Sequence, residues 1–327
     1  LRHRRRLCRR WRVLHAGRLE VLSEPTALGR CRHLVLIIGT PVDEFLNPDF
    51  AAIPRALEGC RAALRDGQVL ILRSTVFPGT SAKVRQWFAE RGLRIAVAFC
   101  PERVAQGRSI EEFATLPQII SAFDPEGLAA ARSVFGLLTP DIVEMAPMEA
   151  EYAKLLTNAW RYIQFAVANQ FYEMAHTNGL DFYRIAAGTC FKYPRLAGMP
   201  GPGFAAGPCL HKDTMQLAAF SQNQFFLGHA AMLVNEGLPD YLVRDAKRTL
   251  ALQDLTAGIL GMAFKGESDD SRSSLSYKLK KILRIEARRV LCADPYVRDP
   301  DLVPQEQLLR EANVIFIGAP HERYRAL

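Results

Sequence analysis

Three short stretches of the sequence are apolar without interruption, and they restrict the fold more than any other feature. Residues 33–39 (HLVLIIG), 68–73 (QVLILR) and 94–99 (RIAVAF) lack the alternation expected of a strand with one face in water. Residues 49–64 and 80–91, which lie between them, have helical spacing. Strands buried on both faces and separated by helices predict a parallel sheet covered by helices, which is an α/β fold.

Each predicted strand is followed by a turn that carries polar groups. Thr40 and Pro41 follow the first strand, Thr75 follows the second, and Glu102 follows the third. Ligands of open parallel sheets bind outside the carboxyl ends of the strands. We therefore expect the chemistry of this protein to lie at these turns.

A long helix is predicted in the middle of the chain. Residues 149–178 contain neither Gly nor Pro, and Gly179 follows as a natural C-cap. About 30 residues at 1.5 Å each make a helix of roughly 45 Å. Helical patterning resumes over 213–228 and 239–251, so this part of the chain is predicted to be all-helical.

The α/β pattern returns near the end of the chain. Residues 257–263 (AGILGMA), 289–292 (RVLC) and 313–318 (NVIFIG) read as strands, and residues 274–286 read as a helix. A second, smaller α/β unit is predicted. Its first strand leads to Lys265 and Arg272, which suit either a diphosphate site or a solvated loop of mixed charge.

The net charge of +8 is concentrated at one end of the chain. Seven arginines lie in residues 1–12, so the remaining residues carry a net charge of only +1. No interleaved basic and aromatic pattern follows, which argues against nucleic acid as a partner. Residues 11–18 alternate charged and apolar types, unlike a signal peptide, and apolar stretches such as 34–38 are far too short to cross a membrane. We expect residues 1–12 to be dispensable.

The seven cysteines are scattered and form no C-x-x-C pair. The sequence therefore predicts neither a disulfide framework nor a metal site, and it favours a reducing, cytoplasmic setting. Most of these cysteines are expected to be small buried residues.

Cys209 is the exception, because it lies in the loop 201–214 (GPGFAAGPCLHKDT). Glycines and other small residues let a substrate approach the backbone closely. A helix start just after Cys209 and a cation at Lys212 would favour the thiolate. The loop therefore predicts a nucleophile.

Lys154 and Asn158 are four residues apart on the predicted long helix, so they project from one face. A cation beside a neutral amide can hold a developing oxyanion. A solvated surface pair is the alternative, and this spacing alone does not exclude it.

Taken together and in order, several segments resemble the UDP-glucose/GDP-mannose dehydrogenases, also called nucleotide-sugar 6-dehydrogenases. The resemblance runs from about residue 17 to the end of the chain. The matching segments are 39–44 (GTPVDE), 74–80 (STVFPGT), 101–103 (PER), 151–158 (EYAKLLTN), the Cys209 loop, and 264–265 (FK) with 268–273 (SDDSRS).

The resemblance implies two Rossmann-like parallel-sheet domains joined by a helical dimerisation domain with one long helix. It implies NAD-dependent oxidation of the C6 alcohol of a UDP-sugar to the uronic acid in two hydride transfers, by a homodimer formed through that helix. The predicted units are a basic unmatched segment 1–16, a partial NAD-binding domain 17–148, a helical domain 149–252 and a nucleotide-sugar domain 253–327.

Roles for individual residues follow from the resemblance. Cys209 matches the nucleophile that forms a thiohemiacetal and then a thioester, and Lys154 and Asn158 match the residues that stabilise the oxyanion. Asp213 and Glu102 match the carboxylates that handle protons and water. The implied substrate contacts are Lys265, Gly203, Phe204 and, from the neighbouring subunit, Arg195, and the implied cofactor contacts are Thr40, Pro41, Thr75 and Glu102.

The sequence also departs from the family pattern. No G-x-G-x-x-G turn follows any strand, and the family's upstream half-sheet and last strand are not recognised, so we expect weak NAD binding. Residues 205–209 (AAGPC) look more like members that act on UDP-N-acetylhexosamines. Two alternatives stay open: a pseudoenzyme that retains sugar-nucleotide binding, and a hydroxyacid dehydrogenase that uses the helix Lys and Asn but no thiol.

Overall fold

The computed structural model describes residues 20–40, 42 and 48–327. Two predictions lie outside the described residues. They are the basic segment 1–16, in which residues 1–12 are expected to be dispensable, and the cofactor contact Pro41. Within the described ranges the predicted fold class is confirmed: two Rossmann-like sheet units are joined by a helical region that contains one long helix.

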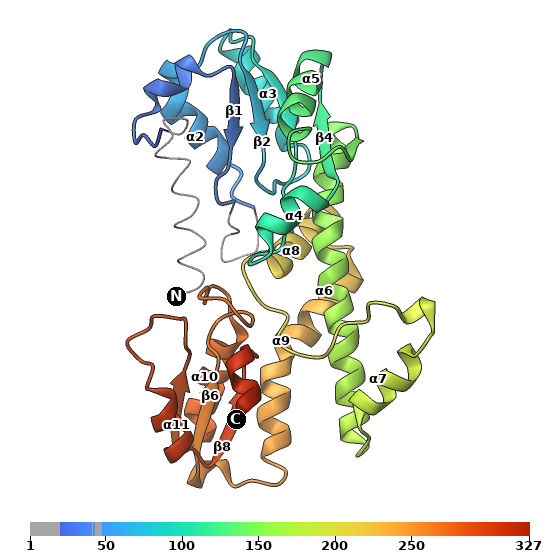
Figure 1. Ribbon diagram of the computed structural model, residues 1–327, viewed down its shortest axis with the longest axis vertical. Coiled ribbons are helices and arrows are strands. Elements are labelled where there is room, and N and C mark those ends of the chain that lie inside the picture. The colour runs from blue at the N-terminus through green and yellow to red at the C-terminus, as the bar shows by residue number, and fades with distance from the viewer. Residues whose placement is uncertain (1–19, 41, 43–47) are drawn as a thin grey trace.

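The molecule is elongated, with one sheet at each end (Figure 1). The long helix α6 (Pro147–Thr177) runs along one side between the two sheets, and α7 (Phe182–Cys190) projects beside its far end. Helices α8 (Leu210–Phe220) and α9 (Phe226–Ala246) pack against α6. The segment that carries Cys209 therefore lies between the two sheets.

The first sheet has the order β1-β2-β3-β4-β5. The predicted strands appear as β1 (His33–Leu36), β2 (Val69–Leu72) and β3 (Ala96–Phe99), and they pair in parallel. Two further strands were not predicted, β4 (Gln118–Ala122) and β5 (Ile142–Glu144). Strand β4 pairs antiparallel with β3, which the sequence analysis did not anticipate. An antiparallel strand starts at the edge where its neighbour ended, so the connection between them need not cross the sheet.

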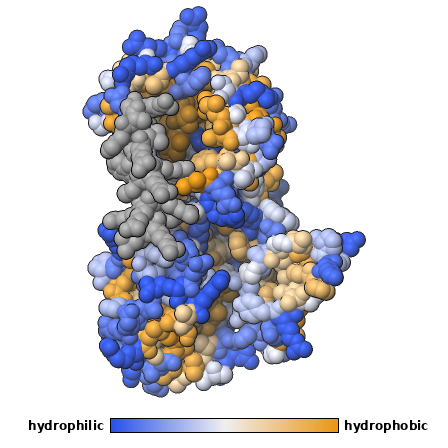
Figure 2. All heavy atoms as spheres, in the orientation of Figure 1, coloured by the Kyte–Doolittle hydropathy of each residue, from blue (hydrophilic) through white to orange (hydrophobic). Residues whose placement is uncertain are grey.

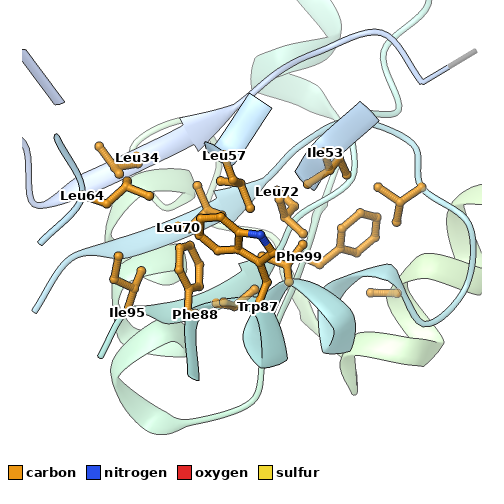
Figure 3. Close-up of a cluster of buried hydrophobic side chains, with 14 of the residues drawn as sticks. Leu34, Ile53, Leu57, Leu64, Leu70, Leu72, Trp87, Phe88, Ile95 and Phe99 are labelled. Atoms are coloured by element: carbon orange, nitrogen blue, oxygen red, sulfur yellow. The ribbon is translucent and has the colours of Figure 1, made fainter. Parts of the chain in front are cut away.

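Strand β2 is buried along its whole length, as its apolar run predicts. Figure 3 shows Leu70 and Leu72 packed with Trp87 and Phe88 of α3 (Thr80–Glu90). Full burial of each such side chain contributes roughly 1.5–3 kcal/mol. This core fixes the carboxyl end of β2, where Thr75 lies.

Strand β1 does not fit the expectation of burial on both faces. Val35 is 44% exposed and Ile37 is 73% exposed, because β1 lies at the edge of the sheet among the described residues. A continuous apolar run cannot distinguish an edge strand from a central one, since the number of neighbours is a tertiary property.

The long helix agrees with its prediction of 149–178 to within two residues at either end. It has 31 residues and begins with Pro147 in its first turn, where a missing N–H costs nothing. The Ala146 N–H donates to Glu149 Oε2 at 2.8 Å. Gly179 follows the helix with φ of +71°, as a C-cap glycine does.

The predicted helices 80–91 and 274–286 agree with α3 and α10 to within one residue, whereas the predictions 213–228 and 239–251 were wrong at their boundaries. The predicted helix 213–228 is split between α8 and α9, because Gln222 and Asn223 adopt positive φ and turn the chain. Pro239 does not start a helix but lies inside α9 and is buried. Its sequence preference for a helix start is overridden by the packing of α9 on α6. Helix α7 was not predicted.

The second sheet has the order β7-β6-β8, and all its pairs are parallel. The three predicted strands appear as β6 (Thr256–Leu260), β7 (Arg289–Ala293) and β8 (Val314–Ile317), with α10 (Leu275–Glu286) between β6 and β7. The remaining elements are α2 (Ala52–Cys60), α4 (Ser109–Thr115), α5 (Pro125–Phe135), α11 (Gln305–Glu311), and the 3₁₀ turns η1 (Pro25–Arg30), η2 (Arg61–Ala63), η3 (Pro194–Leu196), η4 (Leu252–Asp254) and η5 (Glu322–Ala326).

The expectation that most cysteines are buried was wrong for the described part of the chain. Only Cys100 and Cys292 are buried, whereas Cys31 and Cys209 are exposed and the other two are half-buried. Burial raises the pKa of Cys100 to about 12 and that of Cys292 to about 11, so neither thiol reacts at neutral pH. No helix among the described residues is long and apolar enough to cross a membrane.

Candidate active site

Cys209 is the N-cap residue of α8 and is exposed to a cavity of about 500 Å³. The carbonyl oxygen of Cys209 accepts the Asp213 N–H at 2.9 Å and so begins the helix. Residues from both sheets and from the helical region line this cavity, among them Thr40, Thr75, Cys209, Lys212, Arg272 and Ser273. The predicted nucleophile therefore lies at a helix N-terminus, with Lys212 and Arg272 on the wall of the same cavity.

The first sheet contributes its carboxyl edge to the cavity. The Thr40 hydroxyl donates to the Thr75 carbonyl oxygen at 2.6 Å, which joins the turns after β1 and β2. The Ser74 hydroxyl receives the Ile38 N–H at 2.8 Å and donates to the Ile38 carbonyl oxygen at 2.7 Å. Two predicted cofactor residues are thus brought to the thiol, although they are 35 residues apart in the sequence.

Asn158 and Asp213 are hydrogen-bonded to each other and lie next to Lys212 of the cavity wall. Asn158 Nδ2 donates to Asp213 Oδ2 at 2.5 Å, and Lys212 Nζ lies 2.7 Å from Asp213 Oδ1. Asp213 is fully buried, and its Oδ1 has the charge of Lys212 nearby but no hydrogen bond from the described residues. The hydrogen bond between Asn158 and Asp213 therefore connects the long helix α6 to the first turn of α8, directly after Cys209.

Lys154 completes this group. Burial lowers the pKa of Lys154, and the negative charges of Asp213, Cys209 and Glu102 oppose that shift. Each of these groups must be close enough to Lys154 to affect its ionisation. The solvated alternative for Lys154 and Asn158 is wrong, because both side chains are buried.

Glu102 is held by three donors. Arg73 Nη2 donates to Glu102 Oε2 at 2.6 Å, and the Arg103 and Val104 N–H groups donate to Oε1 at 2.7 and 2.8 Å. Both carboxylate oxygens are thus occupied, and Glu102 presents a fixed negative charge to Lys154. Sequence reasoning missed Arg73, whose side chain is almost fully buried.

Sequence reasoning also missed Glu151, although it lies in the matched segment 151–158. Its Oε1 accepts the Ser81 N–H at 2.7 Å and the Ser81 hydroxyl at 2.5 Å, and its Oε2 accepts the Gly79 N–H at 2.5 Å. Burial raises the pKa of Glu151, against these hydrogen bonds. Glu151 thereby attaches α6 to the N-terminus of α3. Its helical spacing from Lys154 and Asn158 was the signal that could have found it.

The predicted substrate residues line a second cavity of about 470 Å³ between α6, α9 and the second sheet. Gly203, Phe204 and Lys265 lie on its wall. Lys265 Nζ donates to the carbonyl oxygen of Gln106 in the first α/β unit. Burial lowers the pKa of Lys265, with a further contribution from Arg161.

Arg195 is not brought to either cavity by its own chain. It lies in η3, exposed, with its guanidinium 5.5 Å from the centroid of the Tyr193 ring. The prediction that Arg195 serves the neighbouring subunit stays a prediction.

Two Rossmann-like units that face a thiol across a shared cavity define the class: this is a nucleotide-binding α/β protein with the layout of an oxidoreductase. Within that class, the chain belongs to the UDP-glucose/GDP-mannose dehydrogenase family. Residues 11–139 match the family's NAD binding domain, residues 148–236 its central domain and residues 258–327 its UDP binding domain.

The chain is similar to UDP-N-acetyl-D-mannosamine dehydrogenases from two archaea. It is 28% identical to that of Methanocaldococcus jannaschii, over 96% of this chain and 73% of the other, and 28% identical to that of Pyrococcus horikoshii, over 96% and 77%. Among solved structures, the Pyrococcus horikoshii UDP-D-ManNAc dehydrogenase superposes with a TM-score of 0.89 over 97% of this chain and 78% of the other, at 28% identity. A UDP-glucose dehydrogenase from Pyrobaculum islandicum gives 0.88 over 97% and 78%, at 26% identity.

The described residues fit NAD, the family's cofactor, at the cavity that contains Cys209. This cavity opens at the carboxyl ends of β1 and β2, where Thr40 and Thr75 would contact the cofactor. Arg272 lines the same cavity, and its guanidinium is bonded to the Asp270 carboxylate. The Gly-rich turn that normally supplies backbone N–H groups to the diphosphate does not occur in this sequence.

Proposed function

We propose that this protein oxidises the C6 alcohol of a UDP-sugar, specifically a UDP-N-acetylhexosamine, to the uronic acid with NAD as oxidant. The observation that carries the proposal is that Cys209 and Lys212 line the cavity between the NAD binding and UDP binding domains, while Lys212 pairs with Asp213, which accepts a hydrogen bond from Asn158 and affects the ionisation of Lys154. The names of the similar proteins support an N-acetylhexosamine. We propose unit boundaries at residues 148/149 and 252/253.

The residue types suit a four-electron oxidation. When bound, NAD supplies the acceptor for each hydride that leaves the sugar C6 carbon. Loss of the first hydride from C6, with release of the hydroxyl proton to water, gives the aldehyde. The Cys209 thiolate adds to the aldehyde carbon, and Lys154 and Asn158 hold the oxyanion that this addition creates. Loss of the second hydride leaves a thioester on Cys209. Water then adds to that carbon, Asp213 takes a proton from the water, and the C–S bond breaks to release the acid and the thiolate.

Limited alkylation tests the site without requiring turnover. Cys209 is expected to react first near neutral pH, because it is exposed beside Lys212 and at a helix N-terminus. A UDP-N-acetylhexosamine should slow its labelling, as measured by peptide mapping. Cys31 is the internal control, since it is also exposed but does not line the cavity. Equal labelling of Cys31 and Cys209, unchanged by the sugar nucleotide, would contradict the proposal.

Separate titrations with NAD and with a UDP-sugar distinguish an enzyme from a pseudoenzyme. An enzyme of the proposed kind is expected to bind both NAD and the UDP-sugar, because each hydride transfer needs the cofactor beside the substrate. Calorimetry on the purified chain measures both affinities. Binding of both ligands would support the enzyme, and UDP-sugar binding without any response to NAD would favour the pseudoenzyme.

We also propose a homodimer through α6, because the exposed face of this helix carries an apolar stripe. Trp160 is 62% exposed and Met174 is 61% exposed, and the stripe as a whole consists of Leu156, Trp160, Val167, Phe171 and Met174. Spacings of three, four and seven residues place these side chains on one face. The projecting α6–α7 region shows apolar colouring in Figure 2. A stripe of this size is typical of a protein interface.

Trp160→Glu is expected to dissociate the dimer, because it places a charge in the middle of the stripe. Analytical ultracentrifugation at micromolar concentration measures the change in mass. Ile285→Glu is the matched control, since Ile285 is 86% exposed on α10, outside the stripe. A wild-type protein that sediments as a monomer, or a Trp160→Glu variant that remains a dimer, would exclude this interface.

A further inference from the structure

The buried face of α6 bonds to the loop that precedes Cys209. Asn169 is fully buried and binds Gly203 in both directions. The Gly203 N–H donates to Asn169 Oδ1 at 2.7 Å, and Asn169 Nδ2 donates to the Gly203 carbonyl oxygen at 3.0 Å. Both backbone polar groups of one loop residue are thus satisfied by a single side chain.

A second buried amide supports the first. Asn169 Nδ2 also donates to Asn235 Oδ1 at 2.9 Å, and Asn235 Nδ2 donates to the Tyr162 carbonyl oxygen at 3.0 Å. Asn235 lies on α9 and is fully buried, so the pair of amides connects α9, α6 and the loop. We call Asn169 and Asn235 the amide pair.

The chemistry at Asn169 requires an amide. A carboxylate could accept from the Gly203 N–H but could not donate to the Gly203 carbonyl oxygen or to Asn235. An aliphatic side chain would leave the N–H and the carbonyl oxygen of Gly203 without their Asn169 partners. A buried Asn that pairs with both backbone polar groups of one loop residue is therefore a specific constraint on that loop.

The loop that Asn169 holds contributes to both cavities. Gly203 and Phe204 line the second cavity with Lys265, and Cys209 follows six residues after Gly203. Asn169 lies 11 residues after Asn158 on α6, which is ~16 Å along the helix. One rigid helix thus sets the distance between the group around Cys209 and the wall of the second cavity.

We propose that the amide pair is a positioning device that fixes the loop 201–209 and thereby sets the affinity for the sugar nucleotide. The effect on affinity rests on the proposed function, whereas the effect on the loop does not. Neither amide lines a cavity, so both act through Gly203 and not by contact with substrate.

The first test needs no ligand. In Asn169→Ala, hydrogen exchange of the Gly203 N–H should accelerate by about 10-fold or more, because its buried acceptor is lost. Asn178→Ala is the matched control, since Asn178 is an exposed Asn at the end of the same helix whose side chain bonds only to the Met174 carbonyl oxygen. Exchange at Gly203 that is unchanged in Asn169→Ala would overturn the proposal.

The second test separates positioning from general destabilisation. Asn169→Ala is expected to raise KM for the UDP-N-acetylhexosamine, or its Kd by calorimetry, by about 10-fold or more, with kcat within about 3-fold of wild type. Asn235→Ala leaves both Asn169–Gly203 bonds in place and should have a smaller effect in the same direction. If Asn169→Ala does not fold, Asn235→Ala provides both readouts.

The outcomes distinguish this inference from the proposed function. A wild-type protein that does not bind the UDP-sugar contradicts the proposed function, and the exchange experiment still decides whether the amide pair holds the loop. Wild-type binding together with an affinity of Asn169→Ala within about 2-fold contradicts the inference alone. A fall in kcat at unchanged KM would also overturn it, because the loop would then act on the reaction and not on substrate affinity.

Discussion

Cys209→Ser should abolish formation of the uronic acid while leaving UDP-sugar binding intact. The thioester hydrolyses readily because a thiolate is a good leaving group, whereas serine would form a less reactive ester from a much weaker nucleophile. We expect a loss on the order of 10³-fold or more in acid formation. Chromatographic detection of the uronic acid, with calorimetry for UDP-sugar binding, measures the two effects separately.

Cys60→Ser is the matched control for the thiol. Cys60 is half-buried at the end of α2 and does not line the cavity around Cys209, so its replacement should leave acid formation unchanged. Full activity in Cys209→Ser would remove the covalent mechanism and favour an oxidation without a thiol.

Lys154→Met is expected to lower kcat by about 10²–10³-fold, the usual cost of removing one group that stabilises an oxyanion. Methionine has a similar length and no charge, so it should fill the space while leaving Asn158 as the remaining donor. Steady-state kinetics with the UDP-sugar measures the loss. Lys281→Met is the control, because Lys281 is exposed on α10. A kcat within about 3-fold of wild type would contradict the role of Lys154.

The same substitution should stabilise the fold. Burial lowers the pKa of Lys154, so between that lowered pKa and 10.5 the unfolded chain binds more protons than the folded one. Wild-type stability therefore rises with pH through this window, and the penalty for burying the ammonium is complete below it. The melting temperature of Lys154→Met should therefore exceed that of wild type below the lowered pKa of Lys154. The difference in melting temperature should shrink as pH approaches 10.5. Thermal melts of both proteins across this pH range measure the sign of the difference in stability.

The predictions that succeeded depend on local pattern. The continuous apolar run of β2 specified a buried strand, and the Gly- and Pro-free stretch 149–178 specified the long helix, because hydrophobic periodicity and capping act over a few neighbouring residues. The same patterns failed where packing decides. Pro239 lies inside α9 because contacts with α6 outweigh its local preference, and β1 is exposed because its place in the sheet is set by distant strands.

The candidate site shows the same division. Residue types and their order along the chain were sufficient to select Cys209, Lys154, Asn158 and Asp213. The hydrogen bond between Asn158 and Asp213 joins residues 55 positions apart, and no local pattern carries that information.

The sequence by itself determined the class of fold, the long helix and the residues available for chemistry, since these depend on side-chain identity and on short-range periodicity. Only the tertiary structure decided that Arg73 holds Glu102, that Glu151 joins α6 to α3, and that Asn169 holds Gly203. Buried polar groups must find partners when water is excluded, and which partners they find depends on how distant segments pack.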